Sequence, residues 1–264
     1  MGRGWYRGWS GRGVRRLGLF AGVAVVALTL TASGQAVVVR GWSFWPGAPT
    51  DQNGPVAALS TKDVWVVGQA ASNDHGTVAH WDGSAWSSQT LPGLASVDAV
   101  AAGDASNVWA GGGGQIDHYD GTSWSTQTTP SPGSDDALTD IAASSASNAW
   151  AVGSYDVTGA GGMVQHLPLP LQYNGTTWSL QPAVIPGTNT DTVFTAVATL
   201  SSTDVWAVGR TSADAFSPTE PLVEHWNGTS WSVSFLPTTG FDGGALTDVY
   251  EASPTNVWAI GSRM

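Results

Sequence analysis

From about residue 56 to residue 262, short apolar segments alternate with polar turns along the chain. Each apolar segment has the length of a strand and is rich in β-branched and aromatic residues, which is typical of β-strands. Four segments follow one another in one stretch of sequence: Phe194–Ala198, Val205–Gly209, Leu222–Trp226 and Trp231–Phe235. No stretch after residue 40 has the periodicity of an amphipathic helix. The pattern therefore predicts an all-β protein built from groups of four strands.

Two sequence phrases recur along the chain at similar distances. The first is Asp or Asn, Val or Ala, and Trp, followed by small apolar residues; its tryptophans are Trp65, Trp109, Trp150, Trp206 and Trp258, spaced by 44, 41, 56 and 52 residues. The second is an aromatic residue, Asp or Asn, Gly, two further residues and Trp; its copies are Trp81–Trp86, Tyr119–Trp124, Tyr173–Trp178 and Trp226–Trp231. A four-stranded unit repeated every ~40–55 residues is typical of a β-propeller blade. The repeat predicts a propeller of about five four-stranded antiparallel blades.

The recurring residues have a structural interpretation. Asp-Gly and Asn-Gly between two strand segments are strong hairpin signals, because these residues tolerate positive φ. The continuous run after each first phrase, such as Trp206-Ala207-Val208-Gly209, predicts a strand buried on both faces. The tryptophans are then expected to fill the space between neighbouring blades, where each ring buries ~150–250 Å².

The order Trp-Ala-Val-Gly, variable loop, Tyr-Asp-Gly-Thr-Ser-Trp-Ser resembles a kelch-type motif and covers residues 56–262. The chain is also similar to secreted bacterial propeller proteins that carry an Asp-Val-Trp-Ala-Val-Gly repeat. It departs from kelch in having one Gly where kelch has two, except at Gly111–Gly114. The copper-radical chemistry of the kelch-type galactose oxidase needs a Cys crosslinked to a Tyr, and this chain has no Cys. The resemblance thus implies a propeller but not that oxidase activity.

The first phrase has five copies and the second has four, so the last repeat is half a blade. Two interpretations are open for the domain 37–264. In one, residues 37–45 supply an outer strand to the last hairpin and close a five-bladed ring, which would remove exposed sheet edges. In the other, the chain is a fragment of a larger propeller.

Residues 1–36 have the layout of an export segment. A basic stretch up to Arg16 precedes the apolar run Leu17–Ala32 and a group of small residues, as in a secretory signal peptide. The apolar stretch can be extended to Val39, which is long enough for an uncleaved membrane anchor. Either alternative predicts an extracellular or cell-surface protein, with membrane contact only through an uncleaved segment.

Charge and composition restrict the classes of partner that the protein is expected to bind. The net charge is −11, and residues 37–264 hold four basic against 20 acidic side chains, a net charge of −16. A surface this acidic repels nucleic acid, so no nucleic-acid partner is expected. The absence of Cys excludes disulfides and thiolate metal sites.

Few side chains are candidates for metal binding or catalysis. His80, His118 and His225 occupy equivalent positions in different units, so they are not expected to converge on one metal ion. Three Glu residues after residue 36 form no evident acid/base pair of the kind that glycosidases use. The sequence therefore predicts a protein without a metal site, a cofactor or enzymatic activity.

Variable loops on a constant scaffold are the usual place for binding surfaces. The connections between second and third strands vary most, from the short Gly111–Gln115 to Ser154–Pro170 and Arg210–Pro221. In a propeller these connections open on one face of the disc. The candidate binding residues on this face are Asp74, His75, Tyr155, Asp156, Phe216 and Glu220. The predicted function is a non-enzymatic binding scaffold for an unknown protein or glycan. The alternative is a carbohydrate-binding or carbohydrate-active propeller, lectin-like or a glycosidase.

Overall fold

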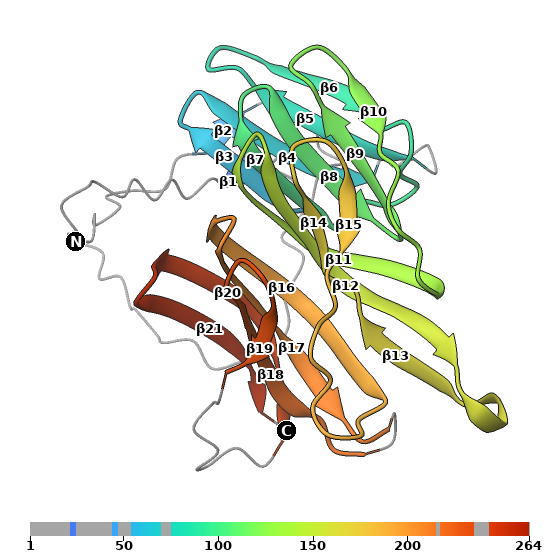
Figure 1. The fold of residues 1–264 in the computed structure, drawn as a ribbon. Coiled ribbons are helices and arrows are strands. Elements are labelled where there is room, and N and C mark those ends of the chain that lie inside the picture. Colours follow the sequence, from blue (N-terminus) through green and yellow to red (C-terminus); the bar gives the residue numbers. More distant parts are fainter. Residues whose placement is uncertain are drawn as a thin grey trace, which may run out of the picture.

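The structure is a computed structural model that describes residues 22–24, 44–46, 54–69, 75–214, 217–234 and 243–263. Five groups of antiparallel strands, named units 1 to 5 in chain order, follow one another along an arc (Figure 1). Units 1 to 4 each contain a four-stranded antiparallel arrangement, and unit 5 is a hairpin in the described residues. The predicted all-β class and four-stranded repeat are confirmed.

The strand bounds follow the repeat closely. Unit 1 contains β3 (Val56–Ser60), β4 (Asp63–Gln69), β5 (Gly76–Trp81) and β6 (Trp86–Thr90). Unit 2 contains β7 (Ala99–Asp104), β8 (Asn107–Gly112), β9 (Gln115–Tyr119) and β10 (Trp124–Thr126). Unit 3 contains β11 (Ser134–Ser145), β12 (Asn148–Thr158), β13 (Val164–Pro168), β14 (Leu171–Tyr173) and β15 (Trp178–Leu180), with a 3-10 turn at Ala160–Gly162. Unit 4 contains β16 (Asp191–Ser201), β17 (Asp204–Ser212), β18 (Glu220–Trp226) and β19 (Trp231–Val233), and unit 5 contains β20 (Gly244–Ser253) and β21 (Asn256–Arg263).

The first strand of each unit contacts the first strand of the next, so β3, β7, β11, β16 and β20 follow one another along the inside of the arc. Side chains on these strands tie the units together. Thr139 Oγ1 donates to the Phe194 carbonyl at 3.1 Å, and Thr195 Oγ1 donates to the Leu246 carbonyl at 2.8 Å. Asp140 accepts the Val197 backbone N–H at 2.9 Å, and burial raises the pKa of its carboxyl to about 6.

Tryptophans of units 1 to 3 fill the space between the units, as the sequence predicts, whereas Trp258 of unit 5 is 66% exposed, contrary to the prediction, because no described unit packs against it. Trp65, Trp109 and Trp150 are 1%, 0% and 0% exposed. Each ring packs against the aromatic pair of the next unit: the Trp65 ring lies 5.0 Å from that of Tyr119 and 5.9 Å from that of Trp124. Burial of such a ring contributes about 4–6 kcal/mol of hydrophobic free energy before the entropy cost of ordering. The apolar core is thus divided among successive interfaces.

The tight turns between third and fourth strands have the predicted chemistry. Gly83, Gly121, Gly175 and Gly228 have φ values of 91°, 90°, 94° and 97°, which residues with a Cβ rarely adopt. The Asx side chain before each Gly accepts backbone N–H groups of its own turn. In unit 1, Asp82 Oδ1 accepts those of Ser84 and Ala85 at 2.7 and 2.8 Å.

The connection Ser154–Pro170 is more ordered than a variable loop. β12 continues to Thr158, the chain turns through Gly159–Gly162, and β13 returns along β12. Gly161 and Gly162 have positive φ, which permits this turn. A parallel pair between His166 and Asp191 then joins β13 to β16, so units 3 and 4 form one continuous sheet.

The predicted ends of the chain are described only in part. Residues 37–43, most of the proposed closing strand, lie outside the described residues, as do most of residues 1–36. β2 (Phe44–Pro46) pairs with β1 (Gly22–Ala24), and β20 and β21 pair with each other. No pairing between unit 5 and β2 or unit 1 is detected in the described residues, so closure of the ring stays a prediction. Among those residues, no helix has the length and apolar character needed to cross a bilayer.

Candidate functional site

One polar contact recurs where the second strand of a unit begins. His80 Nε2 lies 2.9 Å from Asp63 Oδ1, His118 Nε2 lies 3.2 Å from Asn107 Oδ1, and His225 Nε2 lies 2.7 Å from Asp204 Oδ1. Each imidazole also stacks on the tryptophan of its own unit, with centroid distances of 3.8 Å (Trp65–His80), 5.0 Å (Trp109–His118) and 4.3 Å (Trp206–His225). Each histidine therefore has partners within its own unit. In the residues that the structure describes, no group of His, Cys, Asp and Glu has the arrangement of a metal site.

Unit 3 lacks this contact between a histidine and the residue that begins the second strand. Gln172 stands opposite Trp150, at the position that His occupies in units 1, 2 and 4. The Asn148 side-chain amide donates to Ser144 Oγ at 2.7 Å and to Thr199 Oγ1 at 3.4 Å. No imidazole covers Trp150 here, and the surface between units 3 and 4 is hollowed at this point.

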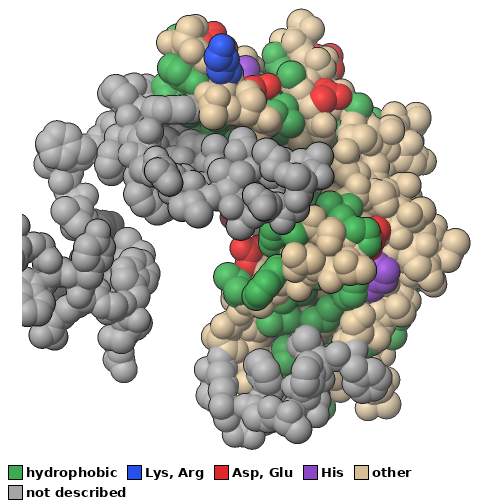
Figure 2. All heavy atoms as spheres, turned by 90° about the vertical axis from the view of Figure 1, so that its left-hand side faces the viewer, with side chains coloured by type: hydrophobic (Ala, Val, Ile, Leu, Met, Phe, Trp, Pro, Cys, Tyr) green, Lys and Arg blue, Asp and Glu red, His purple; other side chains and the backbone are tan. Residues whose placement is uncertain are grey.

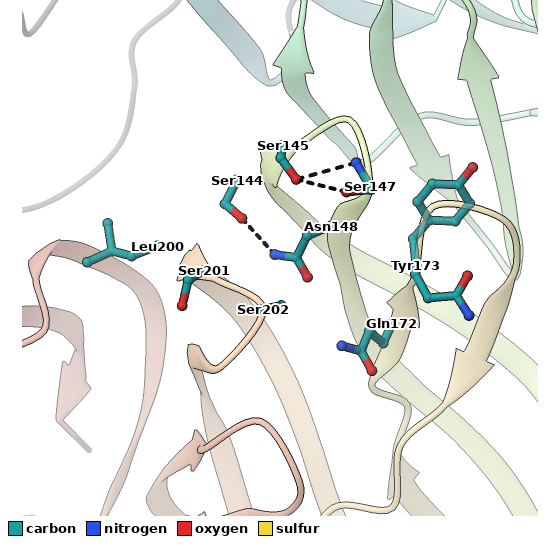
Figure 3. A pocket seen from close by; sticks show the side chains of 10 residues that line it. Ser144, Ser145, Ser147, Asn148, Gln172, Tyr173, Leu200, Ser201 and Ser202 are labelled. Atoms are coloured by element: carbon teal, nitrogen blue, oxygen red, sulfur yellow. Dashed lines mark hydrogen bonds between the residues drawn. The ribbon is translucent and has the colours of Figure 1, made fainter.

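The hollow is a pocket of about 520 Å³ between the turns of the two units (Figure 3). Its lining residues are mostly hydroxyl- and amide-bearing: Ser144, Ser145, Ser147, Asn148, Gln172, Tyr173, Asn174, Leu200, Ser201 and Ser202. Figure 3 shows Ser144 and Asn148 on one side and Leu200 and Ser201 on the turn opposite. The lining holds hydrogen-bond donors and acceptors but no carboxylate, imidazole or amine. Such a pocket can bind an uncharged polar ligand.

At the equivalent position between units 4 and 5, three titratable side chains lie together. Glu251 of β20 faces Asp204, which contacts His225 at 2.7 Å. Burial, and next the adjacent negative charge of Asp204, raises the pKa of Glu251 to about 7. Two neighbouring carboxyls cannot both ionise without repulsion, so Glu251 keeps its proton at mildly acidic pH.

The sequence pattern does not indicate this cluster, because Glu251 and Asp204 are 47 residues apart and lie in different repeats. A signal was present in the repeat. The positions equivalent to Glu251 in the other first strands are Ala58, Ala102, Ala143 and Thr199. A carboxylate at a position otherwise small and uncharged marks this interface as different.

No protein-family model matches the chain, and no curated protein matches its sequence. Among solved structures it is similar to YCF48 from Cyanidioschyzon merolae, with a TM-score of 0.50 and 15% identity, covering 85% of this chain and 69% of that one. A structure of YCF48 bound to D1 peptide has a TM-score of 0.41 at 16% identity, covering 80% and 75% of the two chains. PorZ, a bacterial surface component of the type-IX secretion system of Porphyromonas gingivalis, has a TM-score of 0.40 at 14% identity, covering 84% and 41%.

The fold is β-propeller-like. At these identities the likeness extends to the fold alone. The connections between strands lie at two opposite ends of the sheets. The pocket lies at the end that carries the short turns between first and second strands.

The predicted binding residues lie at the other end. Tyr155 and Asp156 are near the end of β12, and Asp156 is eight positions after Asn148, which corresponds to about 27 Å along a strand. Asp156 Oδ1 contacts His166 Nδ1 at 2.5 Å. Glu220 begins β18, four strands away from β12 in the sheet, or about 19 Å. These residues share an end of the sheet but do not converge.

The other three predicted binding residues do not form a site with Tyr155, Asp156 and Glu220 in the described structure. His75 is exposed and lies in unit 1, directly before β5. Asp74 and Phe216 lie outside the described residues. A binding role for the six residues stays a prediction, and the described pocket is elsewhere.

Proposed function

We propose that the chain is an exported, non-enzymatic β-propeller of about five blades that serves as a binding scaffold for a protein or glycan. The kelch-like repeat and the export-type layout of residues 1–36 support this proposal. Its place of action is then the cell exterior or the cell surface.

The observation that carries the proposal is the pocket between units 3 and 4. It lies on the surface of a scaffold whose units are tied together by buried tryptophans, so its walls are held in place without a ligand. It offers hydrogen-bonding groups and no side chain suited to acid or base catalysis near neutral pH. Its chemistry favours binding over turnover.

The lining of the pocket also favours a second candidate function, carbohydrate binding. Serine hydroxyls and the amides of Asn148, Gln172 and Asn174 both donate and accept hydrogen bonds, which suits the hydroxyl groups of a neutral sugar. The Tyr173 ring is buried against Trp109 of unit 2, with 5.7 Å between ring centroids, so the hydrogen-bonding groups carry this candidate. Orientation of a ligand by a few precisely placed polar groups is a common arrangement in small-molecule sites.

Gln172→His should weaken ligand binding in this pocket while leaving the protein folded. The imidazole would occupy the position of the Gln172 side chain and stack on Trp150, as its counterparts do on Trp65, Trp109 and Trp206. Binding is measured by screening the purified chain on a glycan array and titrating the strongest ligand by calorimetry. We expect at least a tenfold loss of affinity, or about 1.4 kcal/mol of binding free energy.

The matched control is His80→Gln, which makes the opposite exchange in unit 1 and should leave this affinity unchanged. If the selected ligand binds Gln172→His as tightly as the natural sequence, the pocket is not its site. If no glycan binds, the carbohydrate candidate is wrong. The bound glycan should be recovered intact, and release of a cleaved product would contradict a non-enzymatic role.

A further inference from the structure

The turn that joins β16 to β17, residues 200–203, lies between the pocket and unit 5. Three of its residues line the pocket, opposite Asn148 (Figure 3). The Asn148 amide donates to Thr199 Oγ1 at 3.4 Å, and that hydroxyl donates to the Ser201 carbonyl at 2.9 Å. On the other side, β20 of unit 5 packs against β16, β17 and β18. A change in the contact between unit 5 and this turn therefore reaches a wall of the pocket.

Glu251 of β20 meets the turn from the side of unit 5. Its neighbours are the Leu200 backbone N–H, the Trp206 indole and the carboxylate of Asp204, the residue that begins β17. Glu251 is 6% exposed, and neither of its carboxyl oxygens has a hydrogen-bond partner among the described residues. Two ionised carboxylates can only accept hydrogen bonds, whereas a protonated Glu251 has an O–H that can donate to Asp204. One proton on the pair would therefore supply the missing partner.

The corresponding contact beside the pocket is neutral. Asn148 of unit 3 is equivalent to Asp204, and Thr199 of unit 4 is equivalent to Glu251, so an amide meets a hydroxyl there. Small apolar residues take the position of Glu251 in units 1 to 3. Within the described units, two carboxyls meet at this position only between units 4 and 5.

The strands around Glu251 carry few other charges near it. Asp204 Oδ1 contacts His225 Nε2 of β18 at 2.7 Å, and Glu224 of β18 points toward unit 3, where its Oε2 accepts a backbone N–H. Figure 2 shows mostly hydrophobic side chains on the outer face of unit 5, whereas Glu251 lies on the face toward unit 4. The other titratable groups of β16, β17, β18 and β20 lie toward the opposite end of the sheet (Asp191, Arg210, Glu220) or are exposed (Asp248, Tyr250).

We propose that Glu251 and Asp204 share one proton, and that this proton makes the position of the pocket wall, and with it the affinity of the pocket, dependent on pH. With the proton in place, the two carboxyls hold β20 against the turn. Loss of the proton leaves two buried negative charges side by side, and their repulsion moves Asp204 and the turn away from β20. Burial, and next the charge of Asp204, raises the pKa of Glu251 to about 7, so affinity falls as pH rises through this value. The effect on affinity rests on the proposed function of the pocket, whereas the movement of the turn does not.

A label on the turn tests the movement without a ligand. The chain has no Cys, so Ser202→Cys allows a single trifluoromethyl label at an exposed residue of the pocket wall. The fluorine NMR signal should follow a titration near pH 7. Glu251→Gln should remove this titration, because its amide can donate to Asp204 at every pH, and Glu251→Thr, which copies unit 4, should do the same. The matched control is Glu224→Gln, which removes another buried carboxyl of raised pKa and should leave the titration in place.

The ligand measurement uses the glycan that binds most tightly on the array at pH 6. Its affinity should fall about fivefold or more between pH 6 and pH 8.5 for the natural sequence, and less than about twofold for Glu251→Gln. An unchanged fluorine titration in Glu251→Gln, a titration that disappears only in His225→Gln, or no titration at all would each overturn the proposal. Equal glycan affinity at both pH values would overturn control of binding. If no glycan binds but the titration depends on Glu251, the carbohydrate candidate fails and the control of the wall by the shared proton is supported.

Discussion

Replacing Trp150 with alanine should lower the free energy of unfolding by about 3–5 kcal/mol. The Trp150 side chain is fully buried, and its ring lies 5.2 Å from the rings of both Trp226 and Trp231 in the next unit. Alanine would leave a cavity between two sheets whose positions are set by backbone hydrogen bonds, so the surroundings cannot collapse fully into it. Chemical denaturation followed by circular dichroism measures the change.

The matched control is Trp258→Ala, which removes the same side chain from the same repeat position in unit 5. Because Trp258 is 66% exposed, we expect a change of about 0.5 kcal/mol or less. Similar losses for the two variants would show that packing between units is not what makes Trp150 important. A loss below ~1 kcal/mol for Trp150→Ala would contradict its place in the core.

Replacing Glu224 with glutamine should stabilise the protein at alkaline pH but not at acidic pH. Glu224 is 0% exposed, and its Oε2 accepts the Val184 backbone N–H at 3.0 Å. Burial raises the pKa of Glu224 from 4.5 to about 7. Between these values the native protein keeps a proton that the unfolded chain has lost, so stability falls as pH rises through this window.

Glutamine avoids the buried charge, and its side-chain oxygen can still accept the Val184 N–H. At pH 8.5 the gain in unfolding free energy should be on the order of 3 kcal/mol, and near pH 4 it should approach zero. Denaturant titrations of both proteins at the two pH values measure this difference. Glu220→Gln, at the exposed start of the same strand, should show no such dependence. A Glu224→Gln protein that is less stable at both pH values would show that the carboxylate itself is required.

Most of the fold could be predicted because its signals are local. Strand positions follow from apolar runs of strand length, and the turns follow from Asx-Gly pairs whose glycines have φ near 90°. The tryptophans could be assigned to the space between sheets because a strand buried on both faces needs large apolar side chains there. Units 1, 2 and 4 match these expectations strand by strand, and unit 3 adds the strand β13.

The candidate site could not be predicted in the same way. Loop variability pointed to Tyr155 and Asp156, yet this connection forms strands that join units 3 and 4. The pocket arises at the opposite end, where Gln172 interrupts a repeated contact. In the sequence Gln172 is one ordinary polar residue. It becomes informative only when the register places it opposite Trp150.

By itself, the sequence determined the repeat period, the four strands of each complete unit and the burial of Trp65, Trp109 and Trp150, because these depend on short-range backbone preferences and on hydrophobic patterning. Only the tertiary structure decided which polar side chains meet. The contact of Glu251 with Asp204, the pocket beside Gln172 and the exposure of Trp258 all depend on what the neighbouring unit places against a given sheet. Equivalent residues therefore differ in role because contacts between units, rather than contacts along the chain, set their surroundings.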